Sequence, residues 1–302
     1  TTPHIEGYRY GLNKNSTSAK VYYNDGIIIS NSSSAITGTI TGTATGYVVN
    51  TVTNETGGKT ATLIANYGEY DAQGNFVNAY STLATATAGV TSGNTIKVLR
   101  TLSETTAPSV PAGTTVKLDM NDQTTTLTGV TLTNNGTLQI IGDGEIINTK
   151  SNTIKNNGTL NIEEGVKITG VTTYVSGSTG AESTIDNYGN LTVNGGTIIA
   201  KSADAIFNES TGIVTINSGT IEGNKAILRN FGTASTEENP SVKILGGTLT
   251  AKTANGITNK SSIIRFKRSA CLRIVFKDFC FVSSSISISC LSNLEVYPCM
   301  LV

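Results

Sequence analysis

The chain has 302 residues, 21 basic and 21 acidic side chains, and a formal net charge of zero. This balance argues against nucleic-acid binding, which requires a basic excess or stripe. The sequence contains no apolar run of about eighteen residues, so membrane insertion of this fragment is not expected. Only 14% of residues are charged and Gly numbers 32, a polar, β-branched and Gly-rich composition that favours repetitive extracellular β-structure.

Residues 1–67 indicate a β-rich segment without a clear repeat. Short alternating stretches are separated by Gly and Asn turns, as in "YRYGLNK" and "AKVYYNDGIIIS". The stretch "GYVVNTVTNETGGKTATLIAN" at 46–66 predicts a hairpin with "ETGG" at its turn. We interpret 1–67 as the end of an upstream module, with a separate small β-domain as the alternative.

Residues 68–111 are predicted to form the entry to a repeat array. "AYSTLATATAGV" at 79–90 has Ala and Leu at helical spacings and a Gly near its end. A short helix there would cover the exposed first coil, because solenoids require capping elements. An irregular loop is the alternative. Pro108 and Pro111 mark a turn before the first regular coil.

Residues 112–260 carry an internal repeat of about 21–22 residues, seen most clearly in "NNGTLQIIGDGEI" (134–146) and "NNGTLNIEEGVKI" (156–168). An Asn precedes the main apolar strand of each copy. These anchors are Asn134, Asn156, Asn187, Asn208, Asn230 and Asn259. The second and the last of the intervals between them are longer than the repeat, because they contain the inserts "TYVSGSTGAES" (173–183) and "TASTEENPS" (233–241).

Each repeat contains three short apolar stretches, which predicts three short strands per coil. The first alternates, as in Leu138/Ile140, so one face points inward. The second follows a Gly turn, and the third is a single Ile before the next Asn. We assign this third position to Ile154, Ile185, Ile206, Ile227 and Ile257.

Stacking the coils would bury a continuous apolar column that one coil cannot bury alone. The sequence therefore predicts an all-β fold of stacked coils joined by parallel sheets. The anchoring asparagines are expected to form a structural ladder of stacked amides. They are also expected to adopt the left-handed backbone region at the adjoining turn.

The Asn before "GTL-x-I" and the Gly before "TI" resemble the right-handed parallel β-helix of the pectin-lyase-like superfamily. The order "YSTLATATAGVTSGNTIKVL" (80–99), "VPAGTTVKLDMNDQTTT" (110–126) and then coils is similar to the β-helical arrays of bacterial cell-surface proteins. The resemblance covers about residues 68–260. It implies a single-stranded right-handed parallel β-helix, and it is specific for the fold rather than for a function.

Residues 261–302 differ abruptly from the rest. Cys271, Cys280, Cys290 and Cys299 all fall here, and residues 1–270 contain no Cys. Their spacings do not match zinc sites. We interpret 261–302 as an atypical Cys-rich tail produced by a reading-frame shift near 260–264, with a genuine C-terminal cap as the alternative.

The repeats do not present the residue pattern of the superfamily's enzymes. The only His is His4, outside the array, and glycoside hydrolysis requires paired carboxylates. Asp143, Asp186 and Asp204 are expected at different turns of different coils, too far apart to hold calcium. Arg229 is expected in a turn beside Asn230. The chain is therefore expected to be non-catalytic, without a cofactor or a bound metal.

The expected function is an extracellular, adhesin-like β-helical stalk on a bacterial cell surface. Candidate contact loops are the two inserts, with Tyr174, Glu182, Glu237 and Glu238. The expected partners are a host or cell-wall glycan or a surface protein. The alternatives are a polysaccharide lyase-like enzyme and a carbohydrate-binding β-helix. Three of Tyr174, Tyr188, Phe207 and Phe231 on one open face would favour the binding module over the stalk.

Overall fold

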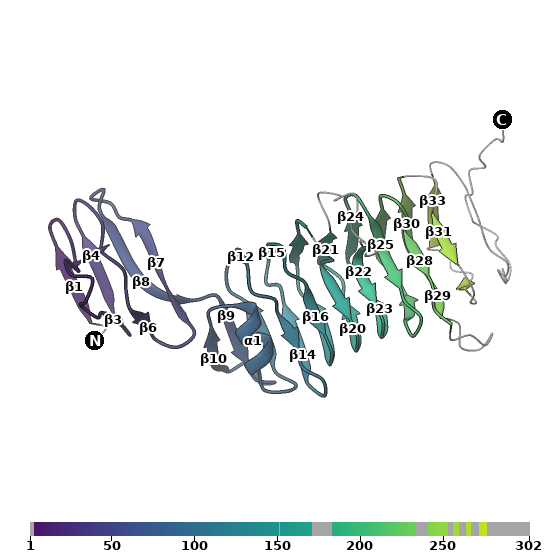
Figure 1. Ribbon diagram of the computed structural model, residues 1–302, viewed down its shortest axis with the longest axis horizontal. Helices are drawn as coiled ribbons and strands as arrows, with labels where there is room; N and C mark the ends of the chain where they lie inside the picture. The colour runs from purple at the N-terminus through teal and green to yellow at the C-terminus, as the bar shows by residue number, and fades with distance from the viewer. Residues whose placement is uncertain are drawn as a thin grey trace.

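The computed structural model describes residues 3–150, 152–170, 183–233, 241–252, 256–259, 264–266 and 272–276. Short strands dominate it, and α1 (Leu83–Gly89) is the one helix in the described part. Figure 1 shows two stacks of strands that follow one another along the chain, a small one and a long one. The expected all-β parallel solenoid with a short capping helix is confirmed.

The small stack consists of two parallel coils closed by a hairpin. β1 pairs with β4, β2 with β5 and β3 with β6, all parallel. The coils contain β1 (His4–Gly7), β2 (Leu12–Asn13), β3 (Tyr22–Tyr23), β4 (Ile27–Ser30), β5 (Ile36–Thr37) and β6 (Gly42–Thr43). The expected hairpin is confirmed as β7 (Tyr47–Thr53) and β8 (Lys59–Ala65), and β8 adds antiparallel to β4. The first residues are therefore themselves a short β-solenoid, which sequence reasoning did not resolve.

The long stack opens with an antiparallel pair and the helix. β9 (Tyr67–Tyr70) pairs antiparallel with β10 (Phe76–Tyr80) and with the first parallel strand of the array. Thr82 caps α1, and its hydroxyl accepts from the Thr85 N–H at 3.1 Å. Leu83 and Ala86 are fully buried. The helix thus lays an apolar face over the first coil, as the capping role predicts.

Two buried carboxylates fix this entry segment. Glu104 accepts hydrogen bonds from Tyr67 Oη at 2.8 Å and from the backbone N–H of Leu83 at 2.9 Å. Glu69 accepts from Tyr80 Oη at 2.7 Å. Burial alone would raise the pKa of Glu69, but this bond and others from the Thr91 N–H and Asn94 hold it below its usual value. Both carboxylates attach the hairpin and helix to the array.

Three parallel sheets form the walls of the long stack. The first contains β11 (Thr95–Val98), β14 (Thr115–Asp119), β17 (Thr137–Ile141), β20 (Thr159–Ile162), β23 (Asn190–Val193), β26 (Ile213–Ile216), β29 (Val242–Ile244) and β32 (Ile264–Phe266). The second contains β12 (Leu102–Glu104), β15 (Gln123–Leu127), β18 (Gly144–Asn148), β21 (Val166–Gly170), β24 (Thr197–Ala200), β27 (Thr220–Gly223), β30 (Gly247–Ala251) and β33 (Leu272–Phe276). The third contains β13 (Ser109–Val110), β16 (Leu132–Asn134), β19 (Ile154–Asn156), β22 (Ser183–Asn187), β25 (Asp204–Asn208), β28 (Leu228–Asn230) and β31 (Ile257–Asn259).

The stacking register aligns like residues from coil to coil. Leu138 faces Leu160, which faces Leu191 in the first sheet, and all three are buried. Such columns place one aliphatic side chain on the next, and a one-residue slip would turn them outward. The core is therefore a continuous apolar column along the stack.

One position differs from the expected arrangement, and two further observations concern the limits of the array. The third-sheet position assigned to Ile227 belongs to Leu228, which aligns with Ile206 and lies two residues before its anchor. Both residues are buried, so only the distance to the Asn distinguishes them. The first parallel coil begins at Thr95, ahead of residue 112. Beyond residue 260, β32 and β33 continue two of the sheets. The four cysteines lie outside the described residues.

Candidate functional site

A column of asparagines lies inside the third sheet, at the end of each strand from β16 onward. Parallel pairing aligns Asn134 with Asn156, and the column continues through Asn187, Asn208, Asn230 and Asn259. Nδ2 of each residue donates to Oδ1 of the next at 2.7–2.8 Å. The first five members are completely buried. This asparagine column joins six successive coils by side-chain hydrogen bonds.

The column also anchors the adjoining turns. Nδ2 of Asn187 donates to the carbonyl oxygens of Gly189 at 3.0 Å and Ile213 at 3.2 Å. The expected left-handed backbone at these asparagines is wrong. Among the described residues other than Gly, positive φ occurs at Asn121 and Asp122. The anchors therefore act through their side-chain amides and do not supply the left-handed turn residue.

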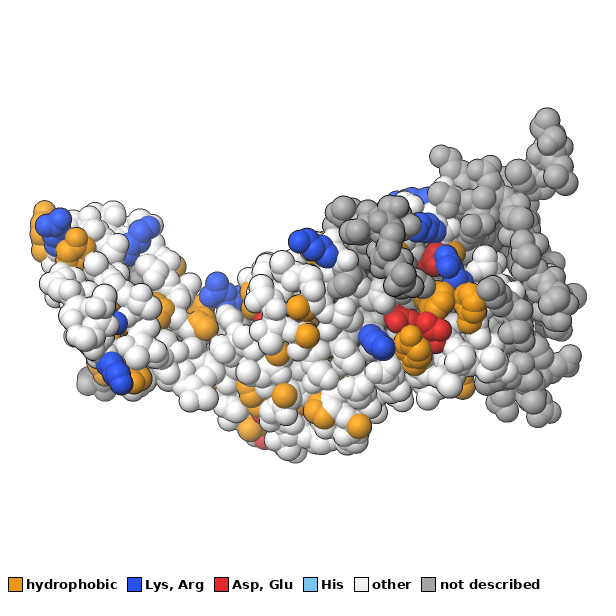
Figure 2. All heavy atoms as spheres, in the orientation of Figure 1, with side chains coloured by type: hydrophobic (Ala, Val, Ile, Leu, Met, Phe, Trp, Pro, Cys, Tyr) orange, Lys and Arg blue, Asp and Glu red, His pale blue; other side chains and the backbone are white. Residues whose placement is uncertain are grey.

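The outer face of the third sheet carries a group of charged and aromatic side chains that contact one another. Inward positions of these strands alternate with one outward position, which lies directly before the asparagine. The polar face, as we name it here, comprises the outward residues of β19, β22, β25 and β28 and the residues that follow the column asparagines of the last three of these strands. Its members are Lys155, Asp186, Phe207, Arg229, Tyr188, Glu209 and Phe231. Figure 2 shows a patch of acidic, basic and hydrophobic side chains in the right-hand half of the molecule, and most of the acidic side chains visible in this view lie there.

Asp186 is the most perturbed carboxyl group of the polar face. Its residue is 8% exposed, and Oδ1 has no hydrogen-bond partner among the described residues. Burial raises the pKa of Asp186 to about 6, the negative charge of Glu209 adds to the effect, and Lys155 opposes it. At pH 6 this carboxyl is therefore half protonated, and it can both donate and accept a hydrogen bond.

Arg229 and Asp204 form an ion pair on the neighbouring strands. Arg229 Nη2 lies 2.8 Å from Asp204 Oδ2. Burial raises the pKa of Asp204, while Arg229 and Lys225 act in the opposite direction. The expectation of turn positions for Arg229, Asp186 and Asp204 is wrong, because all three lie within strands. The two carboxylates occupy different rows of the register, since Asp186 aligns with Phe207 and Asp204 with Ser183.

The aromatic residues of the polar face contact each other and neighbouring charges. Lys155 Nζ lies 4.8 Å from the centroid of the Tyr188 ring, and Tyr188 Oη donates to Glu209 Oε1 at 3.2 Å. The ring centroids of Phe207 and Phe231 are 5.1 Å apart. Tyr188 and Phe231 are half-buried and Phe207 is 7% exposed. Three of the four coil aromatics thus share one face, although only two of them offer accessible ring surface.

The candidate contact residues Tyr174, Glu182, Glu237 and Glu238 lie outside the described residues. In chain order, the first insert follows β21 and precedes β22, and the second follows β28 and precedes β29. β22 and β28 both belong to the third sheet. Each insert is therefore joined in sequence to a strand of the sheet that carries the polar face.

We also searched the described ranges for a metal site and for a membrane-spanning helix. His, Cys, Asp and Glu do not gather there in any group of three suited to hold a metal ion. Helix α1 is too short to cross a bilayer, and it is the only helix of the described part. The fold and its outer face define a parallel β-solenoid with a polar–aromatic surface. No protein-family model, curated protein or solved structure matches the chain.

Sequence reasoning identified the asparagines but missed the polar face. Lys155, Asp186, Phe207 and Arg229 each directly precede a column asparagine in sequence. That shared offset, combined with the alternation of strands, was the signal available for aligning them on one surface. It was not recognised because their side-chain types differ.

Proposed function

We propose that the chain is a non-catalytic, extracellular, adhesin-like β-helical stalk of a bacterial surface protein. It belongs to the general kind of array seen in pectin-lyase-like and surface β-helices. Its polar face contacts a host or cell-wall glycan, or a surface protein. The observation that carries the proposal is the asparagine column, which joins six coils and positions the polar face on its outer side.

The geometry supports rigidity as well as contact. The first sheet contains eight parallel strands from β11 to β32, and at a strand separation of about 4.8 Å they span about 34 Å. Tyr188 and Phe231 offer ring surface next to charged hydrogen-bonding groups. This combination is typical of glycan and protein contact surfaces, in which aromatic side chains pack against the ligand and polar groups orient it.

A binding experiment tests the contact role. The full chain and the Tyr188→Ala/Phe231→Ala variant are immobilised and exposed to a panel of host and cell-wall polysaccharides. The control is Phe76→Ala, which removes an aromatic ring that is 52% exposed on β10, outside the polar face. We expect the double variant to lose at least about tenfold in affinity and the control to bind normally. Equal binding by all three proteins would refute the role of the face.

The surface location has a separate test. Brief trypsin treatment of intact source cells is expected to release peptides of this chain, detected by mass spectrometry, while a cytosolic marker remains inside. Peptides that appear only after lysis would contradict the extracellular proposal.

One observation favours a second candidate, a carbohydrate-active enzyme. A carboxyl with a pKa of about 6 beside another carboxylate is the arrangement from which a general acid for glycoside cleavage is built. Incubation with acidic and neutral polysaccharides at pH 6 should then release new chain ends. This activity should disappear in the Asp186→Asn variant. No release from any polysaccharide would leave the stalk as the better proposal.

A further inference from the structure

The outer end of the small stack has an unpaired parallel edge. β1 is the terminal strand of its sheet, and β2 and β3 are each paired on one side only in the described part. The carbonyl oxygens of Pro3 and Gly7 accept hydrogen bonds from the second coil. Because neighbouring peptide groups of a strand point to opposite sides, those of His4 and Glu6 face away from β4.

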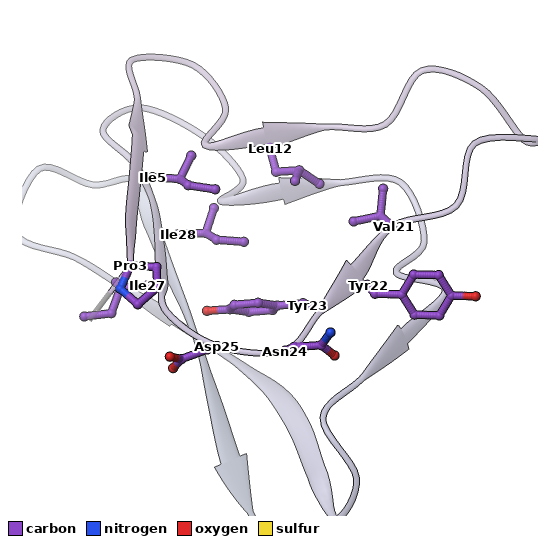
Figure 3. Close-up of a pocket in the computed structure, with 10 residues that line it drawn as sticks. All are labelled: Pro3, Ile5, Leu12, Val21, Tyr22, Tyr23, Asn24, Asp25, Ile27 and Ile28. Atoms are coloured by element: carbon purple, nitrogen blue, oxygen red, sulfur yellow. The ribbon is translucent and has the colours of Figure 1, made fainter. Parts of the chain in front are cut away.

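The apolar interior is open at the same end. Figure 3 shows Ile5, Leu12, Val21 and Tyr23 of the first coil and Ile28 of the second coil around a cavity. The cavity has a volume of about 120 Å³. Ile5 is 47% exposed there, although Ile28, its partner in the next coil, is 3% exposed. An aliphatic residue at an inward position is thus covered in the second coil and uncovered in the first.

The other solenoid ends in this part of the chain are built differently. The second coil is closed by the antiparallel hairpin β7–β8, and Ala61 of β8 is completely buried. The long stack is closed at its first strand by antiparallel β9 and by α1. Antiparallel strands and a helix terminate a parallel ladder, because they do not present the edge on which a further parallel coil could stack. At β1 the described residues include no such closing element.

We propose that the β1–β2–β3 end is a docking surface for one further parallel coil, carried by polypeptide joined to the first residue. The interface would continue the one already present, in which β1, β2 and β3 stack in parallel on β4, β5 and β6. The docking coil pairs with the peptide groups of His4 and Glu6. It places aliphatic side chains over Ile5 and into the cavity.

The path of the chain favours a coil joined in this way. The turn Asn24–Gly26 carries the chain from β3 of the first coil into β4 of the second, and Gly26 has φ +104°. Polypeptide that enters β1 by the same geometry comes from the third strand of the preceding coil. That strand would stack on β3. The docking surface is independent of whatever ligand the polar face binds.

The test replaces residues 1–3 of the chain by a duplicate of one coil. A copy of residues 4–26 is placed directly before His4, so that the Asn-Asp-Gly turn leads into β1. The matched control carries Ile5→Asp and Leu12→Asp in the duplicate only. Amide hydrogen exchange at His4 and Glu6 is followed by NMR, and sedimentation gives the oligomeric state.

We expect these two amides to exchange at least about tenfold more slowly in the extended protein than in the control. Equal exchange in both proteins would overturn the proposal. Concentration-dependent dimers of the unextended chain that disappear on extension would also overturn it, because the occupant would then be a second copy. Tyr22 gives a second readout, because its ring is 61% exposed in the unextended chain. Equal quencher access to this ring in the extended protein and in the control would also overturn the proposal.

Discussion

Replacing Asn187 by Ala removes the central member of the asparagine column. Asn187 accepts from Asn156 Nδ2 and donates to Asn208 Oδ1, both at 2.7 Å, and it is completely buried. Asn156 Nδ2 keeps carbonyl partners, one of them Asn190 O at 3.0 Å. Asn208 Oδ1 loses its amide donor. The damage is therefore concentrated on the side of β25.

The magnitude follows from this inventory. Four hydrogen bonds are lost, two along the column and two from Nδ2 to the carbonyl oxygens of Gly189 and Ile213. The two column bonds contribute about 1 kcal/mol each, and a buried acceptor left without its donor costs about a further 1–3 kcal/mol. We expect a loss of at least about 3 kcal/mol in the free energy of unfolding. For a stack of this size, that corresponds to a fall in Tm of about 6–12 °C.

The assay is urea and thermal unfolding followed by circular dichroism, with hydrogen exchange to locate the opening. The control is Asn157→Ala, which removes one exposed bond to Asn135 Oδ1 at 2.8 Å. We expect the control to lose less than about 1 kcal/mol. If both variants lost the same small amount, the column would not hold the coils together and the reasoning would be wrong.

Three further predictions concern single positions. Because the pKa of Asp186 is raised to about 6 in the folded chain, its contribution to stability is present at pH 4 and lost as the pH rises through 6. Asp186→Asn should therefore raise the free energy of unfolding at pH 7 by up to about 3 kcal/mol. This gain should shrink toward zero at pH 4, as measured by thermal unfolding of both proteins at each pH. Glu104→Ala leaves the buried hydroxyl of Tyr67 without its acceptor, and we expect about 3 kcal/mol of destabilisation and faster exchange in α1; unchanged exchange would contradict the anchoring role. Gly196→Ala combines φ +71° with a Cβ placed 2.4 Å from a backbone carbonyl oxygen, so we expect a loss of about 2–3 kcal/mol. Gly74→Ala, with φ +82° and open space, should cost only about 1 kcal/mol in the same denaturation series.

The inward pattern of the long stack could be predicted because it repeats. Leu and Ile alternate at fixed distances from each Asn, and this spacing determines both the coil length and the parallel register. Leu228 shows the limit of the method. Ile227 beside it is equally apolar, and only the two-residue distance to Asn230 decides which side chain stacks on Ile206.

The outward residues and the small stack were harder to predict for different physical reasons. Residues on the solvent side of a strand are not selected for one shape. The residue types at the positions of Asp186 and Arg229 therefore do not repeat from coil to coil. Their burial and pairing arise from neighbours in other coils. In the small stack the sequence offset between paired residues differs from one strand pair to the next, and no anchoring Asn repeats. Its parallel pairing was therefore invisible to a search for a fixed period.

The near identity of successive coils affects how the number of repeats in the gene can change. Deleting residues 135–156 would join Asn134 to Asn157 and regenerate the same Asn-Asn-Gly-Thr junction. The asparagine column would close across the gap without a new interface, since both neighbours present the same edge. Unequal recombination between such repeats would change the reach of the protein in steps of about 4.8 Å. Length is then a trait that a population can vary without redesigning the fold.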